Sequence, residues 1–382
     1  MTTQHAALVP LSEVDEDFRR QWQQLADESL APNAFFEPAM TLAAASLPEA
    51  PLIELLIVRR DGRIVLLAPV HRVRSYRRLP VAAVKTWKHD YSSLGTPLLS
   101  PDKPAEALET AIRFLADERL GTLLVIESFG SDGPVAAELR TAMDRIGIRP
   151  SSLLTHRREA VLTRRSPDEP QHGLSASTVK NYRKSQRRLD KELGGQLSLV
   201  DVADGDDLGA AVEDFLRAEA SGWKARDGGA FACREGHAAF FRTLCRELAT
   251  ESRLQFYVYG TPETPVAFMC NLIAQDRVFC FKVAFDDDYG RFSPGSTAEL
   301  EELLAFHRQT ELETMDSCRE SKYARKHTLF PDSIEITTML IPLESVRGRA
   351  AARSIPMSNA VGRKLREWRE ALRKKVGWKK PR

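Results

Sequence analysis

The order in which helical and strand-like patterns follow one another constrains this chain of 382 residues more than any other feature. Each half begins with amphipathic helical patterns, continues with strands joined by tight turns, and ends in a strand–helix–strand series. Tight turns join antiparallel strands, whereas a helical crossover joins parallel ones. The order therefore predicts an α+β fold with two tandem units, each a mostly antiparallel central sheet flanked by helices.

Apolar residues that recur with a period of two or about 3.6 mark the elements of the first half. The sharpest signal is Asp61-Gly62 between two apolar runs, which predicts a β-hairpin. We expect strands at 6–10, 52–59, 64–73, 81–87, 122–127 and 152–162, and helices at 16–26, 104–116 and 134–146. A further helix is expected to follow residues 33–38 and to end at Ala45.

The second half repeats this plan. We expect helices at 177–193, 208–220, 237–249 and 296–309, and strands at 197–202, 254–259, 266–274, 278–285, 313–316 and 334–340. The last strand is expected to close the second sheet. Residues 164–173 are polar and contain proline and glycine, which is typical of a linker. The sequence thus predicts a domain at 1–163, a second at 174–345 and a tail at 346–382.

Charge is distributed unevenly along the chain. The tail at 346–382 holds 13 of the 55 basic residues and two of the 53 acidic ones, which leaves 42 basic and 51 acidic residues in 1–345. An acidic body argues against a nucleic-acid-binding protein. The five cysteines form no CxxC pair, so neither a disulfide framework nor a zinc site is expected. Without a signal peptide or a long apolar run, we expect a cytoplasmic protein.

The first stretch with chemical character runs from the strand end at Phe285 to the helix expected at Ser296. Ser296 and Glu299 have the spacing of a capping box, and Ser293-Pro294-Gly295 shapes the entry into the helix. Backbone N–H groups at such a helix start, together with Arg291, suit an anion such as a diphosphate. A plain capped helix is the alternative.

The second stretch, 215–224, is a helix that carries Glu219, ends near Gly222 and presents Trp223 and Lys224. A carboxylate at a helix end beside a cleft can accept a proton, whereas a surface glutamate beside a buried tryptophan would have no such role.

The third stretch, 315–323, follows a strand and contains Asp316, Lys322 and Tyr323. Catalytic residues often lie after strands, but a solvated charged loop would have the same composition.

Taken in this order, the three stretches resemble the GNAT-related acetyltransferases of the cellulose-biosynthesis type found in bacterial exopolysaccharide systems. The matching residues lie at 219–224, 284–286, 293–295, Asp316 and 322–323. The architecture is also similar to that of the Fem-type aminoacyltransferases, which use tandem GNAT folds. The resemblance implies two GNAT-like domains, with the acyltransferase site in the second.

The resemblance implies transfer of an acyl group, in the first place acetyl, from acyl-CoA to an amine such as that of an amino sugar in exopolysaccharide biosynthesis. Acetyl-CoA or another acyl-CoA is the co-substrate, and no metal is needed. Glu219 or Asp316 would remove the amine proton, and Tyr323 would protonate the leaving thiolate. The remaining implied roles are donor binding by Arg291, Ser293, Gly295 and Ser296, and acceptor binding by Trp223, Lys224, Asp286 and Lys322.

Two alternatives stay open at this point. One is an aminoacyl-tRNA-dependent transferase of the Fem type, which the six basic residues at 180–191 favour and the acidic body disfavours. The other is a non-catalytic scaffold in polysaccharide assembly, attached by the basic tail to a protein or to the inner face of the membrane. A tail helix that packs on the body is the simpler reading of the same residues.

Overall fold

The computed structural model describes residues 4–77, 79–165, 175–226, 228–319, 329–343 and 348–355. The first half comprises β1 (Gln4–Pro10), η1 (Leu11–Glu13), α1 (Glu16–Glu28), η2 (Ala34–Phe36), α2 (Pro38–Ala45), β2 (Glu54–Arg60), β3 (Arg63–Val73), β4 (Ala83–Thr86), β5 (Leu98–Leu99), α3 (Pro104–Asp117), β6 (Leu123–Gly130), α4 (Pro134–Arg145) and β7 (Ser151–Val161).

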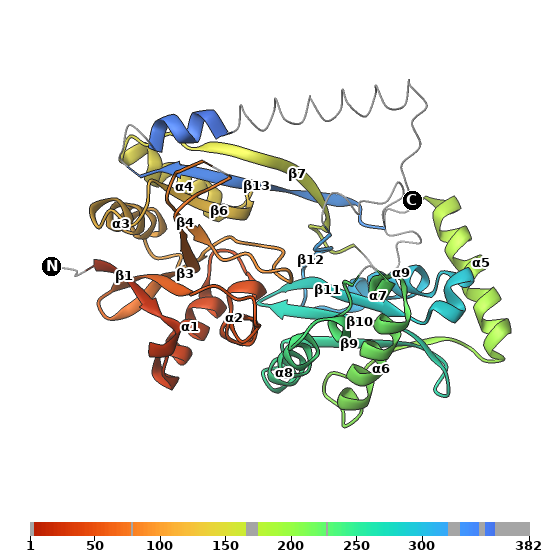
Figure 1. Ribbon diagram of the computed structural model, residues 1–382. Helices are drawn as coiled ribbons and strands as arrows, with labels where there is room; N and C mark the ends of the chain where they lie inside the picture. Colours follow the sequence, from red (N-terminus) through yellow and green to blue (C-terminus); the bar gives the residue numbers. More distant parts are fainter. Residues whose placement is uncertain are drawn as a thin grey trace, which may run out of the picture.

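The second half comprises α5 (Ala176–Leu193), β8 (Ser198–Asp201), α6 (Leu208–Ser221), α7 (Trp223–Arg226), η3 (Phe231–Cys233), α8 (His237–Thr250), β9 (Leu254–Gly260), β10 (Pro265–Ala274), β11 (Arg277–Phe285), η4 (Asp287–Phe292), α9 (Pro294–Arg308), β12 (Thr314–Asp316) and β13 (Asp332–Pro342). Figure 1 shows the two halves side by side, with their helices packed around the strands.

Local chemistry explains several of these boundaries. Helix α1 begins after Asp15 because the side chain of that residue accepts a hydrogen bond from the N–H of Phe18 at 2.8 Å. The hairpin between β2 and β3 turns at Asp61 and Gly62, whose φ angles are 48° and 84°. Two consecutive left-handed residues are what a type I′ turn requires, so the predicted hairpin is confirmed.

The described strands form one 13-stranded sheet with the order β1-β2-β3-β4-β6-β13-β7-β12-β11-β10-β9-β8, and β5 pairs with β3. The pairs β4–β6 and β11–β12 are parallel, and the other pairs are antiparallel. Each parallel pair is joined by a crossover that contains a helix, α3 or α9, as parallel strands require. The predicted α+β class with a mostly antiparallel sheet flanked by helices is confirmed.

One strand does not lie where the sequence analysis places it. The strand expected to close the second sheet, now β13, pairs antiparallel with both β6 and β7 of the first half. Strands β6 and β7 run in the same direction, so an antiparallel strand between them satisfies the backbone groups of both. Strand β7 also pairs with β12, and this contact makes the sheet continuous across the two halves.

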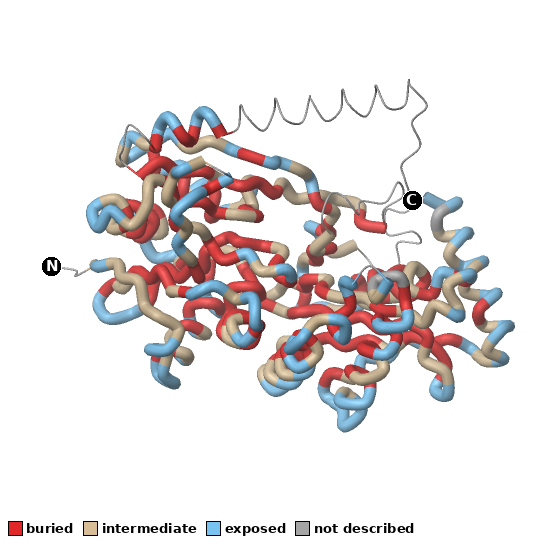
Figure 2. The backbone as a smooth tube through the Cα atoms, in the orientation of Figure 1, coloured by how far each residue is buried: buried red, intermediate tan, exposed pale blue. Residues whose placement is uncertain are grey.

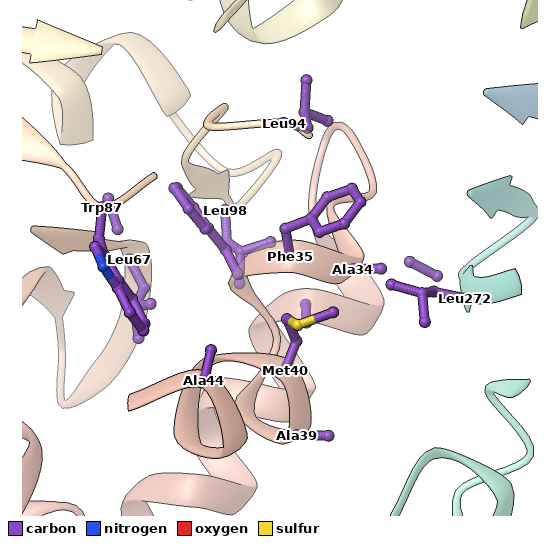
Figure 3. Packing of buried hydrophobic residues seen from close by; sticks show 14 of the residues in the cluster. Ala34, Phe35, Ala39, Met40, Ala44, Leu67, Trp87, Leu94, Leu98 and Leu272 are labelled. Carbon is purple, nitrogen blue, oxygen red and sulfur yellow. The ribbon is translucent and has the colours of Figure 1, made fainter. Parts of the chain in front are cut away.

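The largest apolar core belongs to both halves. Phe35 of the first half lies 5.6 Å from Phe279 and 6.4 Å from Phe281 on β11, measured between ring centroids. Figure 3 shows Ala34 and Phe35 beside Leu272 on β10. The buried segments run through the strands of both halves, whereas α5 is exposed along much of its length (Figure 2). The halves therefore share a core instead of burying separate ones.

The described chain ends in a helix at 348–355. Its residues Ala351, Ala352 and Ile355 are buried in a cluster with Leu123 and Val125 of β6. The start of the basic tail thus packs on the first half, and the tail beyond 355 lies outside the described residues. Among the helices that are described, none is long and apolar enough to cross a bilayer.

The two faces of the second half's sheet are covered by different helices. Buried residues of α6 and α8 belong to the shared core, whereas α9 packs on the opposite face with Val278 and Cys280.

Helix α9 also carries a buried carboxyl group on this face, that of Glu302. Its Oε1 accepts a hydrogen bond from Nδ2 of Asn271 on β10 at 2.6 Å. Burial raises the pKa of Glu302 from 4.5 to about 7.

We expect Glu302→Gln to stabilise the protein at pH 8. A carboxyl whose pKa rises from 4.5 in the unfolded chain to about 7 in the folded one favours folding at low pH. As the pH rises between these two values, ionisation of the buried carboxyl lowers the free energy of unfolding, by roughly 3 kcal/mol at pH 8 relative to low pH. Glutamine keeps the bond from Asn271 without a charge. Denaturant unfolding at pH 5 and pH 8 should show a gain only at the higher pH.

The exposed Glu311 provides the control, since Glu311→Gln should change stability by less than about 0.5 kcal/mol at either pH. A loss of stability in Glu302→Gln at pH 8 would contradict the role of the buried charge.

Candidate active site

The parallel pair β11–β12 ends abruptly. The two strands pair only from Arg277 to Phe279, opposite Thr314 to Asp316, although β11 continues for six residues to Phe285. We call this place the β11–β12 junction: the three paired positions and the remainder of β11, residues 280–285. Beyond the pairing, one edge of β11 is released from β12, and its backbone groups can face a ligand.

A β-bulge at Phe281 changes which side chains face the shared core. Cys270 of β10 is opposite Lys282, and the next residue, Asn271, is opposite Cys280, so Phe281 is the additional residue of β11. The bulge places Lys282 on the side of the sheet where Phe279 and Phe281 lie. Its Nζ is 4.7 Å from the ring centroid of Tyr91 and 5.4 Å from those of Phe231 and Phe281. Bulges are frequent beside active sites because they redirect a side chain in this way.

The carboxylate of Glu219, one of the predicted catalytic residues, lies beside the same part of β11. It is only 4% exposed, and its Oε2 accepts the N–H of Phe231 at 2.8 Å. A cavity of about 20 Å³ is lined by Glu219, by Gly222 at the end of α6, by residues 283–285 of β11 and by Asp287 of η4. That volume is sufficient for one water molecule. A buried carboxylate with space for a water beside an open strand edge can accept a proton.

The start of α9 differs from the predicted one. The helix begins at Pro294, and its N-cap is Ser293, which has a left-handed φ of 56° and makes no side-chain cap bond. The capping box predicted from Ser296 and Glu299 is therefore wrong, because the helix starts two residues earlier. Gly295 has a steric role: a Cβ atom there would lie 3.2 Å from the ring of Phe285. The glycine lets the helix start approach the end of β11 closely.

The predicted donor-binding residues lie together at this boundary between η4 and α9. The N–H groups of Ser293 and Ser296 donate to the carbonyls of Gly290 and Ser293, both at 3.0 Å. Arg291 is exposed and pairs with Glu192 of α5 at 2.5 Å. The guanidinium groups of Arg291 and Arg188 lie 4.7 and 5.4 Å from the centroid of the buried Phe292 ring. Two cationic side chains therefore flank the helix N-terminus, an arrangement that favours an anion.

The β12 side of the junction is held by a buried ion pair. Asp316 accepts a hydrogen bond at Oδ2 from Nη2 of Arg158 on β7 at 2.6 Å, and at Oδ1 from the N–H of Cys318 at 2.8 Å. The side chains of Arg158 and Asp316 are 3% and 2% exposed. Arg158 also donates through Nη1 to the carbonyl of Ser93 at 2.6 Å. Arg158 thus joins β12 to a segment of the first half.

That segment, residues 89–93, contacts β11 and the chain just after β12. The ring of Tyr91 faces Lys282 on β11, and the hydroxyl of Ser93 donates to the carbonyl of Cys318 after β12 at 3.3 Å. The hydroxyl of Tyr91 is hydrogen-bonded to Nδ1 of His237, the first residue of α8. Burial lowers the pKa of His89 to about 3, so its ring is neutral at physiological pH.

The sequence analysis did not identify Lys282, Tyr91 or Arg158. A lysine in the otherwise apolar strand 278–285 was a signal for the first of these residues. Tyr91 and Arg158 carried no local signal, because their side-chain partners His237 and Asp316 are more than 140 positions away along the chain.

Of the predicted acceptor-binding residues, the structure describes the side chain of Asp286 and not those of the others. Asp286 caps η4 by accepting a hydrogen bond from the N–H of Asp288 at 3.0 Å. Trp223 and Lys224 begin α7, shortly after Glu219 along the chain. Their side chains are not among those that the structure describes. Lys322 and Tyr323 lie outside the described residues. Within the described part of the chain, no group of three or more His, Cys, Asp or Glu residues could hold a metal ion.

Comparison with known proteins finds one family that matches the second half of the chain. Residues 176–325 match the acetyltransferase (GNAT) domain family, a span that includes β11, α9 and β12. The match supports an N-acyltransferase, the enzyme class that the sequence predicts. A search of curated proteins finds no match.

Among the solved structures that resemble most of this chain are the following two. FemX matches with a TM-score of 0.56 and 9% identity, over 85% of this chain and 95% of its own. A conserved protein of unknown function from Bacteroides thetaiotaomicron matches with a TM-score of 0.54 and 12% identity, over 87% and 99% of the two chains. At such identities the likeness concerns the fold alone.

We expect Asp316→Asn to destabilise the protein by about 3–5 kcal/mol, because it leaves the buried Arg158 guanidinium without its counter-charge. The double variant Arg158→Met/Asp316→Leu removes both charges and should recover most of that loss. Denaturant unfolding of the wild type and the two variants measures the difference. An Asp316→Asn protein with wild-type stability and no turnover would instead show that Asp316 acts as a catalytic base.

Proposed function

We propose that the chain transfers an acyl group from acyl-CoA to an amine at the β11–β12 junction. The observation that carries the proposal is the short parallel pairing, which ends at Phe279 and leaves six further residues of β11 unpaired with β12. The last three of them, 283–285, line a cavity with Glu219, and Phe285 also contacts the start of α9. The match of residues 176–325 to the acetyltransferase (GNAT) domain supports the same reaction.

In this proposal the donor lies with its diphosphate at the start of α9. Ser293, Gly295 and Ser296 supply the helix N-terminus, and Arg291 supplies a cation at its rim. A Cβ atom at residue 295 would lie 3.2 Å from the ring of Phe285, so glycine allows the closest approach of the helix start to β11. The acyl thioester would then lie along β11 beyond Phe279, where a backbone N–H can stabilise the oxyanion that forms during transfer.

The chemical step needs one proton acceptor and no covalent enzyme intermediate. The neutral amine nitrogen attacks the thioester carbonyl carbon, the C–S bond breaks, and the thiolate of CoA leaves. Glu219 takes the amine proton, directly or through a water in the adjoining cavity. Tyr323 is the proposed proton donor to the thiolate. Trp223, Lys224, Asp286 and Lys322 are proposed to contact the acceptor.

The acceptor that we propose is the amine of an amino sugar, as in exopolysaccharide biosynthesis. Acetyl is the proposed acyl group. The proposed place of action is the cytoplasm, with the basic tail as a contact to the inner face of the membrane or to a protein.

A second donor class is favoured by one specific observation. Helix α5 exposes six cations on consecutive turns, Lys180, Arg183, Lys184, Arg187, Arg188 and Lys191, which span about 16 Å at 1.5 Å per residue. Such a stripe can contact the phosphates of an RNA, so an aminoacyl-tRNA would be the donor in this second proposal. Binding to RNA would weaken steeply with added salt, whereas binding of acetyl-CoA would weaken less because it presents fewer phosphates.

Titration with acetyl-CoA and longer acyl-CoAs, followed by calorimetry and thermal unfolding, tests the leading proposal. Saturation at 100 times the dissociation constant should stabilise the wild type by about 3 kcal/mol. Arg291→Glu should bind roughly tenfold or more weakly, because it loses a charged contact to the diphosphate. Arg20→Glu removes a similarly exposed ion pair on α1 and should bind acetyl-CoA as the wild type does.

Glu219→Gln separates binding from turnover in the same experiment. It should bind acetyl-CoA normally and release the CoA thiol in the presence of an amine about 10²–10⁴ times more slowly. A wild type that responds to no thioester would contradict the proposal.

A further inference from the structure

The exposed face of α5 carries a stripe of cations that packing does not explain. Its members recur at spacings of three and four residues, which places them on one side of the helix: Lys180, Arg183, Lys184, Arg187, Arg188 and Lys191. We call these six residues the α5 stripe. The opposite side of α5 is apolar, and its Leu189 is buried in one cluster with Phe292 and Ala298 at the start of α9. Burial of apolar surface thus accounts for that side of α5 and not for the stripe.

The α5 stripe lacks counter-charges. Within the described part of the chain, none of its members forms an ion pair. The carboxylates nearby have other partners: those of Asp190, Glu192 and Glu301 are bound by the N–H of Leu197, by Arg291 and by Gln186. Every cation of the stripe has two or more like charges three or four positions away, and such pairs destabilise a helix. Binding of an anion to the stripe would relieve this repulsion.

One end of the stripe lies at the proposed position of the donor's diphosphate. Arg188 and Arg291 both lie over the ring of Phe292, which is two residues before the start of α9. Lys184 and Lys191 lie about one helical turn before and after Arg188, roughly 6 and 4.5 Å from it along the axis at 1.5 Å per residue. Figure 1 shows α5 beside α9. The cations of the stripe therefore continue those at the start of α9.

The stripe also lines an open hollow of about 870 Å³. Among the described residues, the lining comes from α5: the six cations together with Ala176, Val179 and Asn181. Pockets that hold small ligands usually measure roughly 300–1,000 Å³. The space along α5 is therefore sufficient for the nucleoside of CoA, which is attached directly to the diphosphate.

The nucleotide end of CoA carries a third phosphate group, on the 3′ oxygen of its ribose. A phosphate so close to the diphosphate can reach only the near end of the stripe. Lys180 at the other end is about 12 Å from Arg188 along the helix axis. That separation exceeds the roughly 8–10 Å over which salt screens exposed charges. A bound RNA, in contrast, would contact the stripe along its whole length.

We propose that Lys184, Arg188 and Lys191 bind the 3′-phosphate of acyl-CoA. The proposal rests on the proposed acyl transfer and concerns the nucleotide end of its donor. Lys184 and Lys191 contact the 3′-phosphate, and Arg188 lies between it and the diphosphate. The stripe thereby selects CoA thioesters over thioesters of pantetheine carriers without this phosphate, and it takes no part in proton transfer.

Calorimetric titration with acetyl-CoA and acetyl-dephospho-CoA, which differ only in the 3′-phosphate, tests the site. The wild type should bind acetyl-CoA about tenfold or more tightly than the analogue, the effect of a charged hydrogen-bonded contact. Lys184→Gln/Lys191→Gln should bind the two thioesters within about twofold of each other, because it loses affinity for acetyl-CoA alone. Without ligand, its melting temperature should be unchanged or about 1 °C higher, since two of the repelling charges are removed. A loss of binding through unfolding would lower that temperature.

Two further double variants provide the comparison. Arg145→Gln/Arg149→Gln removes two exposed cations from the first half and should leave the preference for acetyl-CoA unchanged, which controls for net charge. Lys180→Gln/Arg183→Gln removes two cations from the far part of the stripe and should change the preference less than about twofold.

Equal losses of preference from the two parts of the stripe would show that it acts as a whole, as RNA binding requires, and would overturn the inference. A wild type that binds both thioesters equally well would also overturn it, while the proposed acyl transfer would stand. A wild type that binds neither thioester would contradict the proposed function itself.

Discussion

Three residue pairs hold strand β11 parallel to β12, and the arrangement of the candidate site depends on that short contact. A parallel pair needs a crossover, and here the crossover is η4 followed by α9. The crossover must start at the far end of β11 and return to the beginning of β12. It therefore places a helix N-terminus next to the part of β11 that β12 does not cover. An anion-binding helix start and an open strand edge follow from one topological requirement.

The shared core keeps the two sides of this junction in register. Phe35 packs against Phe279 and Phe281, and Arg158 connects Asp316 with the carbonyl of Ser93. Both contacts join the first half directly to β11 or β12. A domain that was merely tethered by a linker could not hold segment 89–93 in contact with β11 and with the chain after β12. The continuous sheet through β7 and β12 provides the same restraint along the backbone.

Local patterns predicted most of the elements because each buries one face against a core, and that burial leaves a period in the sequence. The hairpin at Asp61-Gly62 and the order β11–α9–β12 were available in this way, and so was Glu219 as a residue of interest. The domain boundaries at 163 and 174 stay predictions. Two other features could not be read locally. Strand β13 has an apolar pattern that suits any sheet, and only pairing with β6 and β7 determines its place. The contacts of Lys282, Tyr91 and Asp316 depend on residues far away in the sequence. Periodicity within a segment does not indicate such contacts.

Hydrogen exchange of the full chain with and without acetyl-CoA tests the central claim most directly. It reports at once on the β11–β12 junction and on the parallel pair β4–β6 of the first half. If acyl-CoA binds where β11 leaves β12, the amides of residues 280–296 should exchange about tenfold more slowly in its presence, and those of 83–96 should not change. Slower exchange confined to 83–96, or no change in either segment at saturating acetyl-CoA, would contradict the account.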